Sequence, residues 1–325
     1  MPWPRPFLLC LALSACAGAP PKVVTPDSAR PFSSDSPWNQ PIAEGAPLDA
    51  DSAALVADLV ASAEGTPGPW INQSEWTIPR YFADASTPTY EVEVSRLRGE
   101  GFEVGAKIPI PDDAEPDPQA DHHMLVLDLA QRRAFDFFKA ARTATGWSCV
   151  VCAAISLDGP GVRPPEDSAN PWTLAHGSRA CGFPLVAGLV TPEEIKAGVI
   201  EHALEISVRR VRANQYVSPA STGHGGTNEV LPGRGLRCGT RVRLDPSVDI
   251  DALGLSPAAR VIARALVHYG AYVGDFAGGV AFVVDGSPRA QAQWQGVLQS
   301  GDLKTLPLDR FQVLAPEPPI HEKKL

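Results

Sequence analysis

Residues 121–140 read DHHMLVLDLAQRRAFDFFKA. Two apolar runs in this stretch, His122–Leu129 and Arg133–Ala140, have the length and composition of β-strands. The polar residues around Asp128–Arg132 separate the runs by only a few positions, which is typical of a hairpin. The stretch therefore predicts an antiparallel strand pair.

Further strand-like runs lie on both sides of this hairpin. They are Glu75–Tyr81, Thr89–Val94, Phe102–Ile110, Cys149–Leu157, Ala271–Val273 and Val280–Val284. A β-rich first part, followed by helix, strand, helix and strand, is too irregular for a doubly wound sheet. We therefore expect an α+β fold in a single domain, with a mainly antiparallel β-sheet or sandwich core and two or three packed helices.

Three segments carry apolar residues at helical spacing. They begin at Asp51, Thr191 and Ser256. Residues Thr191–Glu194 form a capping box with proline at the first helical position. Apolar residues continue at helical spacing from there to Ile206, which predicts one helix with His202 on its buried face and Glu205 on the other.

The composition argues against several classes of protein. The chain has 325 residues, of which 44% are hydrophobic and 20% are charged, and its formal net charge is -9. An acidic chain does not favour nucleic acid, because binding to phosphates needs clustered Lys and Arg. No apolar run approaches the ~18 residues of a membrane span. The glycine loops for nucleotides, the HExxH zinc motif and the GxSxG elbow do not occur, so we expect no cofactor and no metal.

The N-terminus indicates the compartment. Residues 1–16 read MPWPRPFLLCLALSAC, in which Arg5 precedes the apolar run Phe7–Leu13. The last four residues resemble a bacterial lipobox, which implies cleavage before Cys16 and lipidation of that cysteine. Ala17, in place of an aspartate, is similar to the sorting signal for the outer membrane. We therefore expect a cell-envelope protein held to a membrane by its lipid; an ordinary secretion signal is the alternative.

This N-terminus also sets the expected domain boundaries. We expect a signal peptide over 1–15, a lipidated tether over 16–34, a single globular domain over 35–314 and a C-terminal tail over 315–325. The tether is assigned because its residues are rich in Pro, Ser, Ala and Thr and have little apolar periodicity. Cleavage removes Arg5 and no acidic residue, so the mature chain is one unit more negative.

Export changes how the six cysteines are interpreted. Cys10 leaves with the signal and Cys16 carries lipid, so an even set remains for two disulfides: Cys149, Cys152, Cys181 and Cys238. Residues i and i+3 of a strand lie about 10 Å apart, beyond the ~7 Å limit between the Cα atoms of a disulfide. We therefore expect Cys149 and Cys152 to bond to Cys181 and Cys238, in one of two pairings. A four-cysteine zinc site, redox chemistry and free thiols are the alternatives.

Candidate catalytic residues come from several places in the chain. Alternation along the strand puts Asp121 and His123 on one face, and a carboxylate beside a histidine suits general acid–base chemistry. His202 is predicted to point inward, where a histidine needs a partner or a cleft. Asp275 follows a strand and can reach the same end of the sheet. The structural alternative for both histidines is a buried ring with a hydrogen-bond partner.

Three motifs resemble a domain of secreted bacterial proteins whose role is uncharacterised. They are Asp121-x-His-Met-Leu-Val-Leu-Asp128, Gly198-x-Ile-x-His-Ala-Leu204 and Arg241-x-Arg-Leu244. The resemblance runs in order from Pro31 to about Leu314. It implies one continuous domain and singles out further residues, among them Tyr216 and Asp275, but it implies no reaction.

The leading functional hypothesis is an envelope enzyme that hydrolyses a polysaccharide or cleaves it by β-elimination. In this hypothesis the catalytic residues are Asp121, His123, His202 and Asp275, and the substrate contacts are Trp147, Tyr216 and Arg241. The alternative is a non-catalytic envelope protein that binds a glycan or a protein partner. The enzyme hypothesis requires the four catalytic candidates to meet in one open cleft, whereas the binding-protein hypothesis does not.

Overall fold

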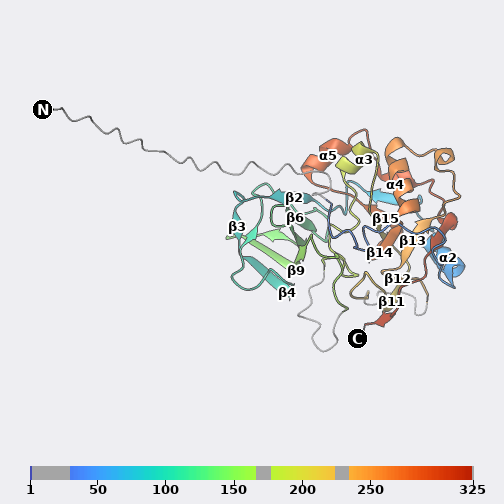
Figure 1. The fold of residues 1–325 in the computed structure, drawn as a ribbon, viewed down its shortest axis with the longest axis horizontal. Helices are drawn as coiled ribbons and strands as arrows, with labels where there is room; N and C mark the ends of the chain where they lie inside the picture. Colours follow the sequence, from blue (N-terminus) through green and yellow to red (C-terminus); the bar gives the residue numbers. More distant parts are fainter. Residues whose placement is uncertain (2–29, 166–176, 224–233, 324–325) are drawn as a thin grey trace. The chain divides into compact units, whose positions relative to one another are not determined.

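Two mixed six-stranded sheets form the body of the protein, and helices pack against one of them (Figure 1). The computed structural model describes Met1 and residues 30–165, 177–223 and 234–323. Residues 31–325 make up one compact unit, separate from residues 1–30. Eight of the thirteen strand pairings in the described segments are antiparallel. The predicted α+β domain with a mainly antiparallel core is confirmed.

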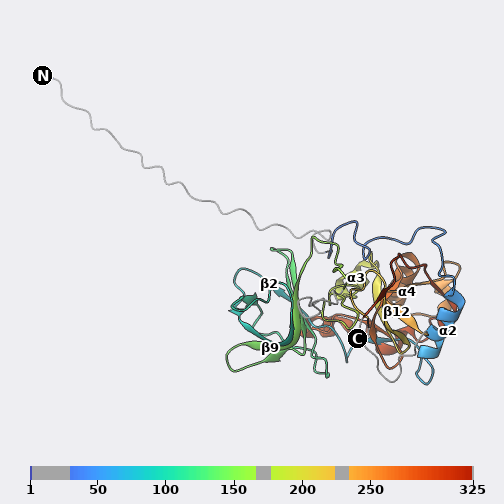
Figure 2. The same cartoon turned by 90° about the horizontal axis from the view of Figure 1, so that it is seen from below.

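The first sheet curls into a half-barrel (Figure 2). Its strands are, in spatial order, β2 (Arg80–Ala83), β6 (Met124–Asp128), β7 (Arg133–Phe138), β9 (Trp147–Ser156) and β4 (Val92–Arg98), with β8 (Ala141–Arg142) beside β9. A separate two-stranded ribbon consists of β3 (Thr89–Tyr90) and β5 (Ile108–Pro109). The predicted hairpin is β6–β7, in which Asp128 pairs with Arg133. Buried Phe102, Phe137 and Trp147 fill the inside of the curl.

The second sheet joins strands that are far apart in the sequence. Its order is β1 (Trp70–Asn72), β15 (Val280–Val283), β10 (Leu204–Val208), β14 (Ala271–Phe276), β13 (Arg241–Leu244) and β16 (Phe311–Val313). A smaller sheet holds β12 (Leu236–Cys238), β11 (Val211–Tyr216) and β17 (His321–Glu322). Residues from both large sheets share one apolar core, and Arg80 of β2 forms an ion pair of 2.9 Å with Asp285, just beyond β15. The two sheets therefore pack as one body.

Four α-helices lie in the described segments. They are α2 (Ser52–Ser62), α3 (Pro192–Ala197), α4 (Pro257–His268) and α5 (Pro288–Trp294), with 3-10 turns η1 (Ile250–Leu253), η2 (Ser300–Leu303) and η3 (Leu308–Arg310). Helix α4 packs on β13 and α2 on β16, while α3 contacts both α4 and α5. The cap of α4 follows from the sequence, because the Ser256 hydroxyl accepts a hydrogen bond from the N–H of Ala259.

The helix predicted from Thr191 to Ile206 is wrong beyond its first turns. The capping box forms as predicted, but α3 ends at Ala197 because Gly198 adopts a left-handed conformation, φ 78. The chain then becomes extended and enters β10. Glu205, predicted on an exposed helix face, is consequently a fully buried strand residue.

The predicted domain boundaries need correction at both ends. Before residue 35, Phe32 is buried and the N–H of Ser33 donates to the carbonyl of Gly159. After residue 314, strand β17 pairs with β11, with Tyr216 opposite His321. The segment 315–325 therefore contributes to a sheet over its described part, because its backbone groups pair with β11.

The predicted cysteine pairing is also wrong. The disulfides join Cys149 to Cys152 and Cys181 to Cys238. Both cysteines of β9 are buried while Val150 and Val151 between them are half-buried, so the strict alternation of the strand breaks there. The Cα atoms of Cys149 and Cys152 are consequently 6.4 Å apart, within reach of a disulfide.

Candidate functional site

A cavity of about 350 Å³ lies where the two large sheets meet, and we call it the intersheet cavity. One wall comes from the second sheet and its loops: Trp70, Asn72, Ser207, Asp275, Phe276, Ala277, Gly278 and Val283. The other comes from the half-barrel side and the loop before α3: Trp76, Ile78, Asp117, Asp121, His123 and Arg179. Three of the four predicted catalytic residues, Asp121, His123 and Asp275, thus meet in one place.

A β-bulge places Asp275 in the cavity. Ile206 pairs with Val273 but the next residue, Ser207, pairs with Asp275, so Gly274 is an extra residue in β14. Bulges re-aim side chains and recur beside active sites. A Cβ atom at residue 274 would lie 2.7 Å from Cγ of Glu205 and 2.8 Å from its Oε1. Glycine is therefore required where the bulge passes the buried Glu205.

The carboxyl groups of Asp121 and Asp275 influence each other across the cavity. Burial raises the pKa of Asp121 above its ordinary value, and the negative charge of Asp275 raises it further. The Asp275 carboxylate accepts hydrogen bonds from the N–H of Phe276 at 2.8 Å and from that of Ala180 at 3.4 Å. Asp121 therefore keeps its proton to a higher pH than an ordinary aspartate does, while two backbone N–H groups donate to the Asp275 carboxylate. Unequal environments of this kind separate an acid from a base.

His123 enters the cavity wall as a neutral ring. Burial and, to a smaller extent, the nearby charge of Arg179 lower its pKa, a backbone hydrogen bond with Ser178 opposes the shift, and the resulting pKa is about 3. The buried Nε2 atom has no hydrogen-bond partner. An imidazole that stays neutral at physiological pH is suited to orienting a ligand through a hydrogen bond, and not to donating a proton as an imidazolium.

Buried ionisable groups surround Arg179, which lines the cavity. Arg179 Nη1 lies 3.5 Å from Glu205 Oε2, and the Ser207 hydroxyl donates to Glu205 Oε1 at 2.9 Å. Burial raises the pKa of Glu205 to about 7. It also raises that of Asp136 to about 7, although Asp136 accepts a hydrogen bond of 2.8 Å from the N–H of Leu185. A buried arginine with two weakly acidic neighbours is typical of a functional centre.

Two tryptophans provide the aromatic surface of the cavity. Trp76 is 43% exposed and has a positive φ of 55, an uncommon conformation for a bulky residue. Trp70 is half-buried and its Nε1–H donates to Asn72 Oδ1 at 2.8 Å. Exposed tryptophan faces at a cavity suit the apolar faces of sugar rings, since indole combines a large flat surface with one polar group.

His202 does not take part in this cavity. Its Nε2 is 2.7 Å from Glu194 Oε1 and its Nδ1 is 2.9 Å from the carbonyl of Ala203. Burial raises the pKa of Glu194, but the charge and hydrogen bond of His202 outweigh burial, so that pKa is lower than usual. His202 is therefore a buried ring with hydrogen-bond partners, and it links α3 to the start of β10.

Replacing His202 with alanine should therefore reduce stability and leave ligand binding in the cavity unchanged. The loss of a charge-assisted hydrogen bond to a buried carboxylate is expected to lower the free energy of unfolding by about 2 kcal/mol at pH 7. The depressed pKa of Glu194 means that this contribution disappears as the pH falls below the ordinary glutamate pKa. Urea denaturation measures both effects, with the exposed His268→Ala as control. Lost binding at unchanged stability would contradict the assignment.

The three predicted substrate contacts are also elsewhere. Trp147 is 1% exposed, inside the half-barrel core, and Tyr216 is 2% exposed and stacks on His321. Arg241 donates to the carbonyls of Tyr269 and Gln40. Each makes contacts within the fold, and none of the three lines the intersheet cavity, whereas Trp70 and Trp76 do.

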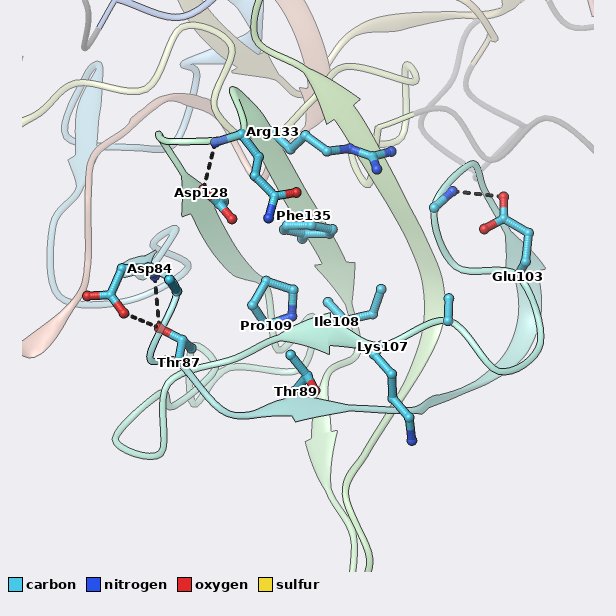
Figure 3. Close-up of a pocket in the computed structure, with 14 residues that line it drawn as sticks. Asp84, Thr87, Thr89, Glu103, Lys107, Ile108, Pro109, Asp128, Arg133 and Phe135 are labelled. Atoms are coloured by element: carbon cyan, nitrogen blue, oxygen red, sulfur yellow. Dashed lines mark hydrogen bonds between the residues drawn. The ribbon is translucent and has the colours of Figure 1, made fainter. Parts of the chain in front are cut away.

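A second cavity, of about 390 Å³, opens on the half-barrel (Figure 3). Its carboxylates serve local turns: Asp84 accepts from the N–H of Ser86, Glu103 from that of Gly101 and Asp128 from that of Gln131. The Ser86 hydroxyl and then the Ser86 N–H lower the pKa of Asp84, and the N–H groups of Glu103 itself and of Gly101 lower the pKa of Glu103. Ordinary ionised turn residues carry no special chemistry, so the intersheet cavity is the better candidate.

Within the described segments, no three His, Cys, Asp or Glu side chains gather into a metal-binding group. No helix in these segments has the length and apolar character that crossing a bilayer requires. Cys16 lies outside the described residues. Comparisons with protein-family models, with curated proteins and with solved structures found no match to this chain.

Proposed function

We propose that the protein is an envelope lipoprotein whose intersheet cavity cleaves a polysaccharide, by hydrolysis or by β-elimination. The observation that carries the proposal is the meeting of Asp121, from the turn before β6, and Asp275, from β14, in one cavity with the exposed Trp76. The cavity volume of about 350 Å³ is in the range of small-ligand sites and suits one or two sugar units of a longer chain.

Hydrolysis needs an acid for the leaving oxygen and a base or nucleophile that acts at the anomeric carbon. In β-elimination an acid likewise protonates the leaving oxygen, and a base removes a ring proton. Asp121, whose pKa is raised, would protonate the leaving oxygen. Asp275, with two backbone N–H groups on its carboxylate, would act as base or nucleophile. His123 and Ser207 would orient the sugar hydroxyls, and Trp76 would stack on a sugar ring.

A screen for cleavage tests this proposal. The full mature chain is incubated with envelope and environmental polysaccharides, and new reducing ends and unsaturated products are measured. Cleavage of at least one polysaccharide is expected. The competing candidate is a non-catalytic protein that binds a glycan or a protein partner; it is favoured if glycans bind in the cavity and remain intact. The buried, weakly acidic Glu205 and Asp136 favour an enzyme, because such groups are costly for a site that only binds.

The lipid anchor is a separate part of the proposal, supported by the sequence of residues 1–16 and by the resemblance to secreted bacterial proteins. The Cys16→Ser variant is expected to move from the membrane fraction to the soluble fraction and to lose incorporation of labelled palmitate, because stable anchoring depends on acyl chains. Fractionation of cells expressing either form measures this. A Cys16→Ser variant that stays with the membrane would rule out this anchor.

A further inference from the structure

The guanidinium of Arg179 has one unpaired edge in the wall of the intersheet cavity. Its Nη1 atom faces Glu205 at 3.5 Å, whereas Nε and Nη2 are buried and have no hydrogen-bond partner. Nε and Nη2 are the two donors of one side of the fork, spaced to bind both oxygens of a carboxylate. An unpaired buried donor is destabilising, so the fold maintains this edge at a loss of stability.

A third buried nitrogen without a hydrogen-bond partner belongs to the same wall. His123 Nε2 is buried without a partner, His123 lines the cavity with Arg179, and the two side chains are close enough for Arg179 to affect the pKa of His123. A neutral imidazole can donate from this nitrogen to an oxygen acceptor. Three buried nitrogens without a partner therefore belong to two neighbouring side chains that line the cavity, and together they suit an acceptor with more than one oxygen.

The acidic residues around Arg179 only partly neutralise its charge, which favours binding of an anion. Its acidic neighbours are Glu205 and Asp136, both with a pKa of about 7, so neither is fully ionised at neutral pH. Asp275 and Asp121 lie nearby, but Asp275 is engaged by backbone N–H groups and the pKa of Asp121 is raised. Arg179 is thus a buried cation whose counter-charge is only partly supplied by the protein.

We propose that the intersheet cavity binds a uronic acid unit of an acidic polysaccharide, with the sugar carboxylate on Nε and Nη2 of Arg179 and a carboxylate oxygen near Nε2 of His123. This inference rests on the proposed function and names the substrate class. It assigns Arg179 as the residue that distinguishes an acidic sugar from a neutral one. The planar carboxylate matches the planar fork, whereas a tetrahedral sulfate matches it less well.

Calorimetric titration tests the inference with the disulfide-intact mature chain. The probes are trisaccharides of galacturonate, glucuronate and mannuronate, their methyl esters, and a sulfated neutral trisaccharide. At least one acid is expected to bind ten-fold or more tightly than its ester, and more tightly at pH 6 than at pH 8, because Glu205 and Asp136, each with a pKa of about 7, lose negative charge as the pH falls. Equal binding of every acid and ester, or preference for the sulfated sugar, would overturn the inference.

Two variants test whether Arg179 is the residue that recognises the sugar carboxylate. Arg179→Lys keeps the charge but removes the bidentate edge, so it should abolish the preference for acid over ester while binding the ester as before. Arg243→Lys is the matched control, since Arg243 is also buried but donates to Gln312 in the second sheet. An Arg179→Lys protein that keeps the preference would refute the assignment. Cleavage of neutral polysaccharides without uronate binding would leave the proposed function standing and defeat this inference alone.

Discussion

Replacing Asp121 or Asp275 with asparagine is expected to lower kcat/KM on the polysaccharide substrate by roughly 10²–10⁴-fold in each case. Asparagine keeps the shape of the side chain but can neither release nor accept the proton that the reaction moves. Because the two carboxylates would act in the same turnover, the double variant should lose much less than the product of the two single losses. Initial rates of the three purified variants measure these effects.

The pH profile separates the two carboxylates. Asp121 would act in its protonated form, so the wild-type rate should fall as the pH rises through the elevated pKa of Asp121. The residual rate of Asp121→Asn should lack this fall, whereas that of Asp275→Asn should keep it. Asp84→Asn, in the turn beside the second cavity, is the control and should retain the wild-type rate. Near-wild-type rates for both cavity variants would show that the pair is not catalytic.

Local sequence signals predicted individual helices and strands better than they predicted which strands pair with one another. The cap at Ser256, the capping box at Thr191 and the β6–β7 hairpin form as predicted, because each depends on residues within a few positions. Helix α5 was missed although Ser287-Pro288 repeats the signal of Ser256-Pro257. The parallel pairing of Trp70 with Ala281 joins segments about two hundred residues apart, and no periodicity specifies such a pair.

The same distinction explains which parts of the site were predictable. Asp121 and His123 were found because they are close in sequence at the start of a strand-like run. The assumed alternation does not hold there, because β6 begins at Met124 and His122 has a positive φ. Arg179 and Trp76 were missed because they lie in irregular segments, where only the tertiary fold decides what a side chain meets. Glu205 had a readable signal: an acid inside the apolar run Leu204–Val208 is a buried acid if that run is a strand, and the helical interpretation hid it.

Removing the Cys181–Cys238 disulfide with paired alanine substitutions is expected to lower the free energy of unfolding by about 4 kcal/mol. This follows from the chain entropy of the loop closed by residues 57 apart in sequence. The same substitutions at Cys149 and Cys152, only three residues apart, should cost about 2 kcal/mol. Denaturant titrations of the two double variants measure the difference, and peptide mapping without reduction verifies the pairing. Equal losses for the two pairs would contradict a loop-closure origin.

The two disulfides should differ in their effect on the site as well. Cys181 donates its N–H to the carbonyl of Gly274 at 3.1 Å, and the preceding Ala180 and Arg179 contact Asp275 and Glu205. The Cys181–Cys238 bond therefore holds the segment that carries Arg179 against the bulge that aims Asp275. Reduction is expected to weaken ligand binding in the intersheet cavity at temperatures where the chain remains folded, whereas the Cys149→Ala/Cys152→Ala variant should bind as the wild type does. Calorimetric titration of that variant, before and after reduction of its remaining disulfide, isolates the contribution of Cys181–Cys238, and unchanged binding after reduction would separate this bond from the geometry of the site.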